Sequence, residues 1–423
     1  MLAELQALQN NIRVGIVGMG SMGKGLLHQC QITPGIRCVV VADVVLERAI
    51  ACVDHWKLDY EVVQTLGAAN LAIERDKIAV CEDGELAARC AVADVLIEST
   101  SAISAAGTFA TLALTLGKHL VMMNAEADLV FGPYLMHLAR ESDLVYTSCD
   151  GDQHGVLKRL IDEMQLWGIE LVMAGNIKGF LDRDSNPTKI IPEADKRRLD
   201  YRMATAYTDG TKLCIEMALL ANGLDLRTHV PGMFGPRAND VREVFERFDL
   251  DALWRDRKPC VDYILGAEPG GGVFAIGFCE ERYQQEMLAY YKLGEGPFYL
   301  FYRPYHLCHV EAMRCVAEAA LDRRALLQPR FGFRTNVFAY AKRPLRVGEE
   351  LDGIGGYTCY GLIENVVDDA LRPGLPICLA EGVRVKRAVG KGEKLHMEGV
   401  EYDPRRLDFE LYAKAVAAAR CPP

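Results

Sequence analysis

Short apolar runs alternate with segments of helical spacing over the first part of the chain. Runs of this kind, rich in Val and Ile, are typical of strands buried in a parallel sheet, and helices between them build βαβ units. The stretch between residues 52 and 92 has helical spacing and is harder to place in such a sheet. The expected strands occupy residues 13–18, 36–43, 93–100, 119–124 and 143–149.

The pattern changes beyond this first domain, residues 1–150. Residues 151–304 mix helix, strands and loops rich in charge, Pro and Gly, so we expect an α+β domain for substrate binding or oligomerisation. A long helix is expected over 305–327, packed back on the first domain. Residues 335–405 have short strands and no long helix, which predicts a small β-rich domain, and residues 406–423 form a closing helix. The predicted fold class is α/β, with a doubly wound parallel sheet in the first domain.

The composition excludes several classes of protein. The formal net charge is −10, whereas nucleic-acid binders usually carry a basic stripe, so we expect no nucleic-acid partner. The 14 cysteines are scattered singly with no C-x-x-C pair, which favours reduced thiols over a disulfide scaffold or a zinc site. The N-terminal segment lacks the apolar core of a signal peptide, and no apolar run approaches the roughly 20 residues that cross a bilayer. We therefore expect a cytoplasmic protein outside the membrane.

A glycine-rich turn follows the first expected strand and opens the next helix. Gly18, Gly20 and Gly23 have the G-x-G-x-x-G spacing of the dinucleotide-binding (Rossmann) fingerprint, in the strand–turn–helix context that it requires. The first glycine permits the tight turn, the second lets the pyrophosphate approach, and the third allows the helix to pack on the strand. We therefore expect NAD or NADP, with its pyrophosphate at the helix N-terminus. The loop residues of this site are Gly18, Met19, Gly20, Ser21, Met22 and Gly23.

An acidic residue, Asp43, ends the second expected strand. Its carboxylate can accept a hydrogen bond from a ribose 2′-hydroxyl and would repel a 2′-phosphate, which favours NAD, although Arg48 lies one helical turn further on. Polar residues also end two central strands, where the nicotinamide is expected, and helix capping is the alternative explanation for them. These residues are Ser99, Thr100, Ser101 and Asn124.

The residues expected to carry the chemistry lie in the second domain. Hydride transfer to a carbonyl needs a proton donor beside the forming alkoxide. Asp209 and Lys212 lie at the start of an apolar helix, three positions apart and on one face. We expect Lys212 to exchange the proton and Asp209 to orient it. A solvated ion pair is the alternative explanation.

Several further residues are candidates for the chemistry, Lys178 first among them, or for binding the substrate. Lys178 lies between two glycines in "GNIKGF", where a loop near a ligand and an ordinary turn are equally compatible with the sequence. Glu126 follows a central strand, and Arg303, His306 and His309 lie in "YRPYHLCH". The arginine offers an anion site, while a histidine at a helix start is more often a cap.

One short segment, "DGDQH", suggests metal ligands. Asp150, Asp152 and His154 have side chains of the types that bind a divalent metal. Asp152 is also a suitable helix N-cap, and this simpler interpretation favours no metal site.

Several of these motifs resemble those of a known family. The fingerprint, the loop "GNIKGF" and the Asp209–Lys212 helix are similar to the homoserine dehydrogenase superfamily, in which an Asp and a Lys beside the nicotinamide serve hydride transfer. The closer resemblance is to SAF-domain-containing NAD(P)-dependent oxidoreductases, which include the DXP reductoisomerase-like enzymes, and it covers nearly the whole chain. The stretches that carry it are "MMNAEAD", "AGNIKGFLDR", "YTDGTKL", "FYRPYHL" and "RPLRVGEELDGIGGYTCYGLIE".

The resemblance implies the reduction of a keto sugar phosphate, coupled in the reductoisomerase-like members to a rearrangement of the carbon skeleton. It also implies that the β-rich module, residues 335–405, is a SAF-like β-clip. Two positions depart from the pattern. Glu126 stands where homoserine dehydrogenases have a lysine, which argues against homoserine, and Asp43 favours NAD where the reductoisomerase-like enzymes use NADPH.

Three functions are compatible with these residues. We expect an NAD(P)-dependent oxidoreductase that acts on a small, phosphorylated, polyhydroxylated ketone or aldehyde, with Lys178 and Arg303 binding its anionic groups. The alternatives are a reductoisomerase that makes 2-C-methyl-D-erythritol 4-phosphate and a non-catalytic protein that senses NAD(P) or binds sugars. The apolar strands of the middle domain need cover, so we expect a homo-oligomer.

Overall fold

The computed structural model describes residues 1–197, 199–369 and 372–420. The contacts divide the chain into two compact units, and both are discontinuous in sequence. The first unit comprises residues 1–155, 307–329 and the C-terminal part from 410, and the second comprises 156–306 and 330–409.

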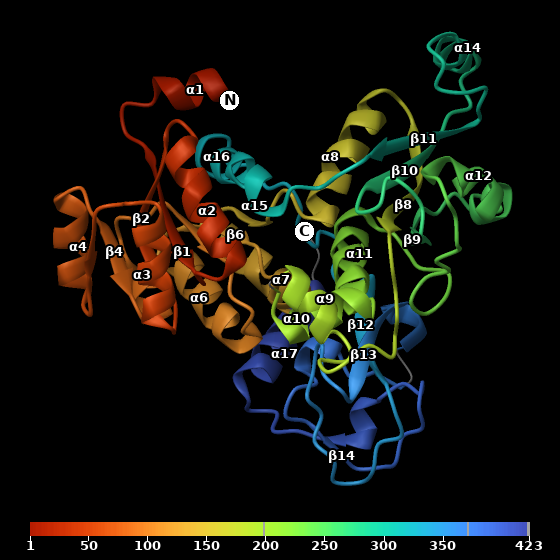
Figure 1. Cartoon of the computed structure of the whole chain (residues 1–423). Helices are drawn as coiled ribbons and strands as arrows, with labels where there is room; N and C mark the ends of the chain where they lie inside the picture. The colour runs from red at the N-terminus through yellow and green to blue at the C-terminus, as the bar shows by residue number, and fades with distance from the viewer. Residues whose placement is uncertain (198, 370–371, 421–423) are drawn as a thin grey trace. The chain divides into compact units, whose positions relative to one another are not determined.

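A seven-stranded parallel sheet forms the first unit (Figure 1), and its strand order is β3-β4-β2-β1-β5-β6-β7. The order reverses at β1, which pairs with β2 on one side and β5 on the other, so a crevice opens at the carboxyl ends of these strands. The strands are β1 (Ile12–Val17), β2 (Ile36–Ala42), β3 (Tyr60–Val62), β4 (Ile78–Cys81), β5 (Val95–Glu98), β6 (His119–Met122) and β7 (Tyr146–Ser148).

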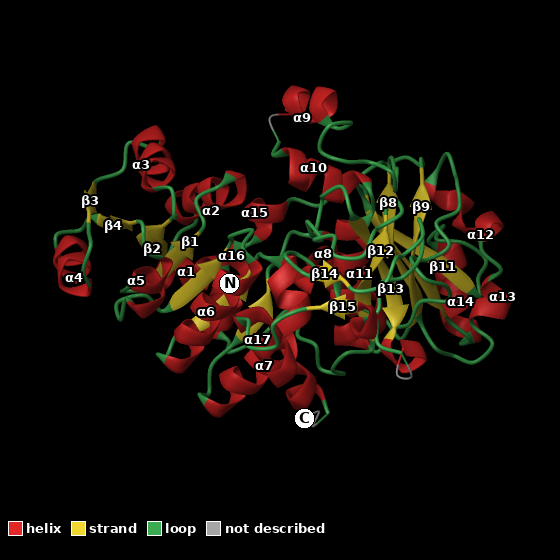
Figure 2. Ribbon diagram, turned by 90° about the horizontal axis from the view of Figure 1, so that it is seen from below, coloured by secondary structure: helices red, strands yellow, loops and turns green. Residues whose placement is uncertain are grey.

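Helices cover both faces of this sheet. Figure 2 shows α2 and α3 on one face and α5, α6 and α7 on the other, which is the doubly wound arrangement expected from the sequence. The helices are α1 (Leu2–Ala7), α2 (Ser21–Ile32), α3 (Leu46–His55), α4 (Leu66–Glu74), α5 (Gly84–Arg89), α6 (Ile103–Thr115), α7 (Ala125–Glu141), α15 (Cys308–Glu311) and α16 (Met313–Leu321). The fold class is therefore confirmed.

Two local features of the first unit differ from the expectation. The stretch 52–92 contributes two strands, β3 and β4, besides helices; β3 is a short edge strand with half-exposed side chains, so it has no apolar run to reveal it. The helix expected over 305–327 is shorter and divided. Its second part ends at Leu321, just before Arg323 adopts a φ of +54°.

The second unit contains a four-stranded mixed sheet in the order β11-β10-β8-β9. Its strands are β8 (Glu170–Lys178), β9 (Cys260–Leu265), β10 (Val273–Phe278) and β11 (Phe298–Arg303). Only β8 and β9 run parallel to each other; the other pairs are antiparallel. The helices of this unit are α9 (Ile191–Arg197), α10 (Tyr201–Thr208), α11 (Thr211–Leu224), α12 (Val244–Arg247), α13 (Leu250–Leu253) and α14 (Arg282–Tyr290), while α8 (Gln153–Leu166) and α17 (Leu407–Ala419) begin in one unit and end in the other.

The β-rich segment expected over 335–405 belongs to this second unit. Its strands β12 (Thr335–Ala341) and β13 (Cys359–Asn365) form an antiparallel pair that packs on α11, and β14 (Arg384–Val385) pairs with β15 (Val400–Glu401). Every residue of α11 from 211 to 223 is buried, which its apolar sequence allows on all sides. The β-rich segment therefore shares one core with the helix that carries the expected catalytic residues.

Two expectations about chemistry and location can be compared with the structure. No disulfide joins the described cysteines. Within the described part of the chain, no helix combines the length and hydrophobicity that crossing a bilayer requires.

Candidate active site

The glycine-rich turn runs from the end of β1 into α2. Gly18 has a φ of +95°, and a Cβ there would lie 2.7 Å from the main chain of Ser99. A Cβ on Gly23 would lie 1.9 Å from the carbonyl oxygen of Gly18, so only glycine lets the helix approach the strand. At Gly20, in contrast, a Cβ would meet no atom of the described residues within 4 Å. The first and third glycines serve the turn, and the second keeps clear the place where a pyrophosphate fits.

Replacing Gly20 by alanine tests this division of roles. The φ of Gly20 is −70° and its added methyl group has room, so we expect the free energy of unfolding to fall by no more than about 1 kcal/mol, the value of an N-cap. The methyl group would occupy the approach of the pyrophosphate, so the Kd for NADH and NADPH should rise at least about 10-fold, or 1.4 kcal/mol, in fluorescence titrations. Gly67→Ala, which also adds a methyl group in open space, is the matched control. Equal affinity in both variants would place the cofactor elsewhere.

Asp43 lies beside this turn and is buried. Its Oδ2 accepts a hydrogen bond from the main-chain N–H of Met19 at 2.8 Å, and its Oδ1 accepts one from Val45 at 2.9 Å. The half-exposed Arg48 contacts both oxygens, at 3.2 and 3.3 Å. The carboxylate expected to bind the ribose therefore also ties the glycine turn to the end of β2, and a guanidinium partly neutralises it.

The polar residues after β5 and β6 have structural contacts. The Ser99 Oγ lies 2.9 Å from the carbonyl oxygen of Val17 and 2.8 Å from that of Gly18, so it links the ends of β5 and β1. The Asn124 Oδ1 accepts a hydrogen bond from the N–H of Ala127 at 3.0 Å and caps α7. Helix capping, the alternative that the sequence left open, thus accounts for the side-chain oxygen of Asn124.

A buried carboxyl group that the sequence analysis did not single out, Glu98, lies at the same edge of the sheet. Its Oε1 accepts a hydrogen bond from the main-chain N–H of Thr100 at 2.9 Å, whereas Ser101 is exposed. Burial raises the pKa of Glu98 to about 8, although Thr100 and Asn124 favour its charged form. This side chain is fully buried and therefore mostly protonated at neutral pH. Glu98 lies inside the apolar run "VLIEST", where a single acidic residue gives no recognisable pattern.

In the second unit, charged side chains lie inside the buried helix α11. Lys212 is 7% exposed and Glu216, one turn later, is 2% exposed. Charged residues are almost never so deeply buried without a partner, because moving a charge out of water is costly. Their position in the first turns of this helix therefore indicates a functional site.

Lys178, at the end of β8, joins this group. Its Nζ donates a hydrogen bond to the carbonyl oxygen of Tyr207 at 2.8 Å, and the Nζ of Lys212 lies 6.0 Å from the centre of the Tyr207 ring. Loss of hydration lowers the pKa of Lys178, while Glu216, Asp209 and the thiol of Cys214 oppose this effect. The structure thus brings together Lys178, Asp209 and Lys212, the three residues expected to carry the chemistry.

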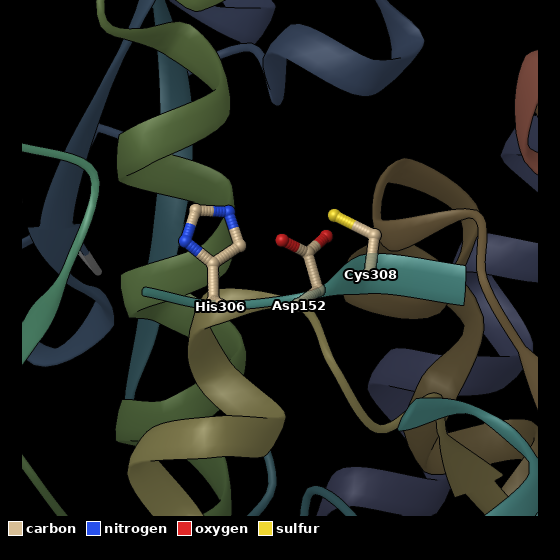
Figure 3. Close-up of side chains that lie close together, drawn as sticks. All are labelled: Asp152, His306 and Cys308. Carbon is tan, nitrogen blue, oxygen red and sulfur yellow. The ribbon is translucent and has the colours of Figure 1, made fainter. Parts of the chain in front are cut away.

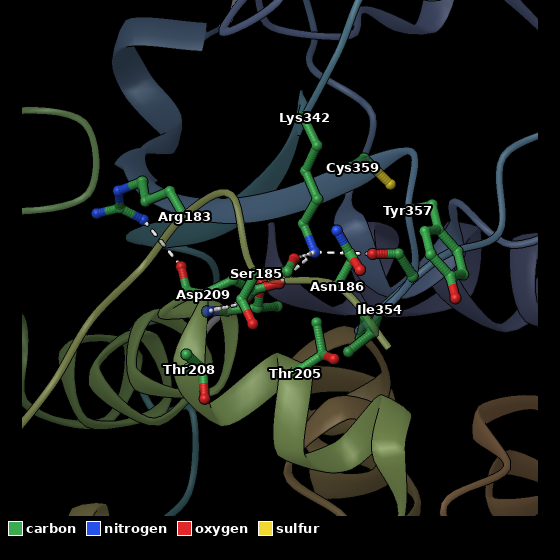
Figure 4. A network of polar contacts seen from close by, with 12 residues as sticks. Arg183, Ser185, Asn186, Thr205, Thr208, Asp209, Lys342, Ile354, Tyr357 and Cys359 are labelled. Carbon is green, nitrogen blue, oxygen red and sulfur yellow. Dashed lines mark hydrogen bonds and ion pairs between the residues drawn. The ribbon is translucent and has the colours of Figure 1, made fainter. Parts of the chain in front are cut away.

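The contacts of Asp209 differ from the expectation. Its carboxylate lies 2.8 Å from the Nζ of Lys342, which follows β12, and both side chains are buried (Figure 4). Lys342 also donates hydrogen bonds to the carbonyl oxygens of Ser185 and Gly356, each at 2.8 Å. Burial raises the pKa of Asp209, and Lys342 opposes that rise. Asp209 was expected to orient Lys212; its ion-pair partner is instead a lysine of the β-rich segment.

The remaining candidates lie around these two sites. Glu126 is buried in the first turn of α7, in the first unit. Arg303 ends β11, and its guanidinium carbon lies 4.6 Å from the centre of the Tyr305 ring. The Nδ1 of His306 lies 2.7 Å from the carbonyl oxygen of Gly271, whose own N–H donates to Ile177, next to Lys178. Gly271 therefore links His306 to the end of β8 through two hydrogen bonds.

The segment "DGDQH", for which a metal site was considered but not favoured, shows a different pairing. The Asp152 Oδ1 accepts the main-chain N–H of Gln153 at 2.9 Å. In the first unit its carboxylate and the thiol of Cys308 lie within 4.8 Å of each other (Figure 3). His306, also labelled there, is the last residue of the second unit before the chain returns to the first. Asp150 and His154, the other two residues of this segment, are both buried.

The segment that contains Lys178 and Lys212 is similar to a known family. Residues 151–312 match the family model described as "Oxidoreductase DRL, catalytic domain". This range includes Lys178, Asp209, Lys212 and Glu216. No curated protein matches the chain.

Solved structures with similar folds include several oxidoreductases. Biliverdin reductase from Synechocystis sp. PCC 6803 is 17% identical, with a TM-score of 0.29, and the similarity covers 41% of this chain but only 49% of that one. A probable dehydrogenase from Thermotoga maritima is 9% identical over 74% of this chain and 90% of that chain, with a TM-score of 0.42. A 1-deoxy-D-xylulose 5-phosphate reductoisomerase from Zymomonas mobilis is 14% identical over 49% and 57% of the two chains, with a TM-score of 0.34.

Proposed function

We propose that this chain, an NAD(P)-dependent oxidoreductase with a DRL catalytic domain over residues 151–312, transfers a hydride between the nicotinamide and a small, phosphorylated, polyhydroxylated ketone or aldehyde. The observation that carries the proposal is the group formed by the half-buried Lys178 at the end of β8 and the buried Asp209, Lys212 and Glu216 at and after the start of α11. A site of this kind suits a reaction in which negative charge develops on a carbonyl oxygen.

The two lysines have different roles in this proposal. In the direction of reduction, hydride adds to the carbonyl carbon and the oxygen takes a proton. A donor works best when its pKa lies near the working pH, and loss of hydration shifts the pKa of Lys178 downward, in that direction. Lys178 therefore gives the proton, and in oxidation its neutral form takes it back. Lys212, in the first turn of α11, holds the oxygen by its charge.

The cofactor supplies the hydride and binds in the first unit. The turn from Gly18 to Gly23 and the N-terminus of α2 would hold the pyrophosphate, since Gly20 keeps this approach clear. Asp43 favours a free 2′-hydroxyl, but Arg48 contacts both of its oxygens and reduces the repulsion that a 2′-phosphate would meet. We therefore propose that the protein accepts both NAD and NADP.

The experiment is a turnover assay with defined substrates. Oxidation of NADH and NADPH is followed with C4–C6 sugar phosphates, including 1-deoxy-D-xylulose 5-phosphate, and with the corresponding free sugars. Turnover of at least one phosphorylated carbonyl compound, with Kd values for the two cofactors within about 10-fold, or 1.4 kcal/mol, supports the proposal. Formation of a rearranged carbon skeleton would identify a reductoisomerase. Tight cofactor binding without oxidation by any compound would instead identify a non-catalytic protein.

A further inference from the structure

Arg183, in the loop after β8, has an unusual environment. Its Nη1 donates a long hydrogen bond, 3.4 Å, to the main-chain oxygen of Asp209 (Figure 4), and its guanidinium carbon lies 5.5 Å from the centre of the Tyr360 ring. Burial raises the pKa of Cys214 and Tyr263, and Arg183 opposes the rise in both, so these side chains also face it. Among the described residues, no carboxylate forms an ion pair with this half-buried arginine.

The charges around Arg183 do not balance. The surrounding group has four basic side chains, Lys178, Arg183, Lys212 and Lys342, and three carboxylates, those of Asp182, Asp209 and Glu216. Asp209 is already paired with Lys342. Asp184, the other acidic neighbour of Arg183 in the loop, is exposed and paired with Lys391. A partly buried surplus of positive charge is unfavourable by itself and favours an anion as its partner.

Two glycines lie close to the guanidinium. A Cβ on Gly210 would lie 2.9 Å from Leu181 and 3.4 Å from Nη1, and a Cβ on Gly232 would lie 2.6 Å from Leu362 and 3.1 Å from Nη2. Both glycines have positive φ angles, +83° and +76°. Side chains at these positions would crowd the donor atoms that a planar, forked group such as guanidinium offers to phosphate oxygens.

We propose that Arg183 binds the phosphate group of the substrate. This inference rests on the proposed function, and it adds the residue that selects phosphorylated compounds. Lys178 and Lys212 then act on the carbonyl end of the same molecule. From the sequence, Lys178 and Arg303 were expected to bind anionic groups; Arg183, in "GFLDRD", belongs to no motif that indicates anion binding.

The test compares Arg183→Met, Arg183→Lys and Arg255→Met in the full-length protein. Arg255 is an exposed arginine of the same unit, so its replacement removes the same charge without touching the site. Binding of inorganic phosphate and of erythrose 4-phosphate is measured calorimetrically with NADH bound, and KM is measured for the sugar phosphate and for the free sugar. Thermal unfolding shows whether each variant is folded.

The expected result is a rise of at least about 30-fold in the Kd for both phosphate probes in Arg183→Met, as for the loss of a hydrogen bond to a charged group. Arg183→Lys should recover part of the affinity, Arg255→Met should match the wild type, and KM for the free sugar should not change. Equal weakening toward phosphorylated and free sugar, or no change in phosphate binding, would overturn the proposal. Because phosphate binding is measured without turnover, this result stays distinct from a failure of the proposed reaction.

Discussion

Replacing Lys178 by methionine is expected to lower kcat for carbonyl reduction about 100-fold or more, the range for loss of a positioned proton donor. The Kd of the cofactor should not change, because Lys178 is not among the residues expected to bind it, which lie in the glycine turn, at Asp43 and after β5 and β6. Lys178→Arg should be equally slow, since a guanidinium keeps the charge but cannot release a proton near neutral pH. Stopped-flow measurement of cofactor oxidation gives the rate.

The pH profile separates Lys178 from Lys212. Loss of hydration lowers the pKa of Lys178, so its protonated form disappears below the pH at which an ordinary lysine titrates. Reduction by the wild type should therefore slow as pH rises through this pKa, and oxidation should accelerate over the same interval. The Lys178 variants should lose this dependence, whereas Lys212→Met should be slow but keep it. If Lys212→Met loses the dependence and Lys178→Met retains it, the roles of the two lysines are reversed.

Replacing Lys342 by methionine should lower the free energy of unfolding by about 3–5 kcal/mol, the cost of leaving a buried charge without its partner. Asp209 is fully buried and Lys342 is 4% exposed, so water cannot replace the lost cation. The second change Asp209→Asn should restore much of this loss, because the amide oxygen can still accept the hydrogen bond from Thr211. Urea unfolding of the two single variants and the double variant provides the measurement.

The pH dependence of the same loss gives an independent check. A carboxyl group whose pKa is raised in the folded state destabilises the protein once it is ionised. Removing Lys342 raises the pKa of Asp209 further, so the deficit of Lys342→Met should be smaller at pH 5 than at pH 8. A deficit that stays constant with pH, or no rescue by Asp209→Asn, would show that Lys342 contributes by packing alone. Lys391→Met, which breaks an exposed ion pair with Asp184, is the control and should cost less than about 1 kcal/mol.

The sheet of the first unit could be predicted wherever the chain has a local signal. Five of its strands are apolar runs, and the glycine spacing identified the turn into α2. The strand β3 was missed because it is exposed at an edge, and β4 because its apolar residues do not stand out from those of the neighbouring helices α4 and α5. A short strand between helices of similar apolar content has too few residues to show a period of two.

The candidate site was predictable in its residues but not in its pairing. Lys178, Asp209 and Lys212 stand out locally, beside glycines or at a helix start, and the structure gathers them. The partner of Asp209 lies in another segment, and no local pattern links position 209 to Lys342 or to Arg183. Glu98 and Glu216 lie in apolar sequence, where a single acidic residue gives no periodic signal. Long-range contacts of this kind depend on the fold as a whole.

The chain is synthesised from its N-terminus, but the first unit also contains segments that are made much later. The first unit needs residues 307–329 and the chain from 410 onward: Leu411 packs at Gly107, and Lys414 lies over the ring of Tyr134. At about 5–20 residues per second, the ribosome needs roughly 10–50 s to make the chain between residues 155 and 410. During that time α6 and α7 lack α17, the helix that covers them. The nascent first unit therefore exposes apolar surface until the residues from 410 onward have been made, and this interval is when chaperone binding should matter most.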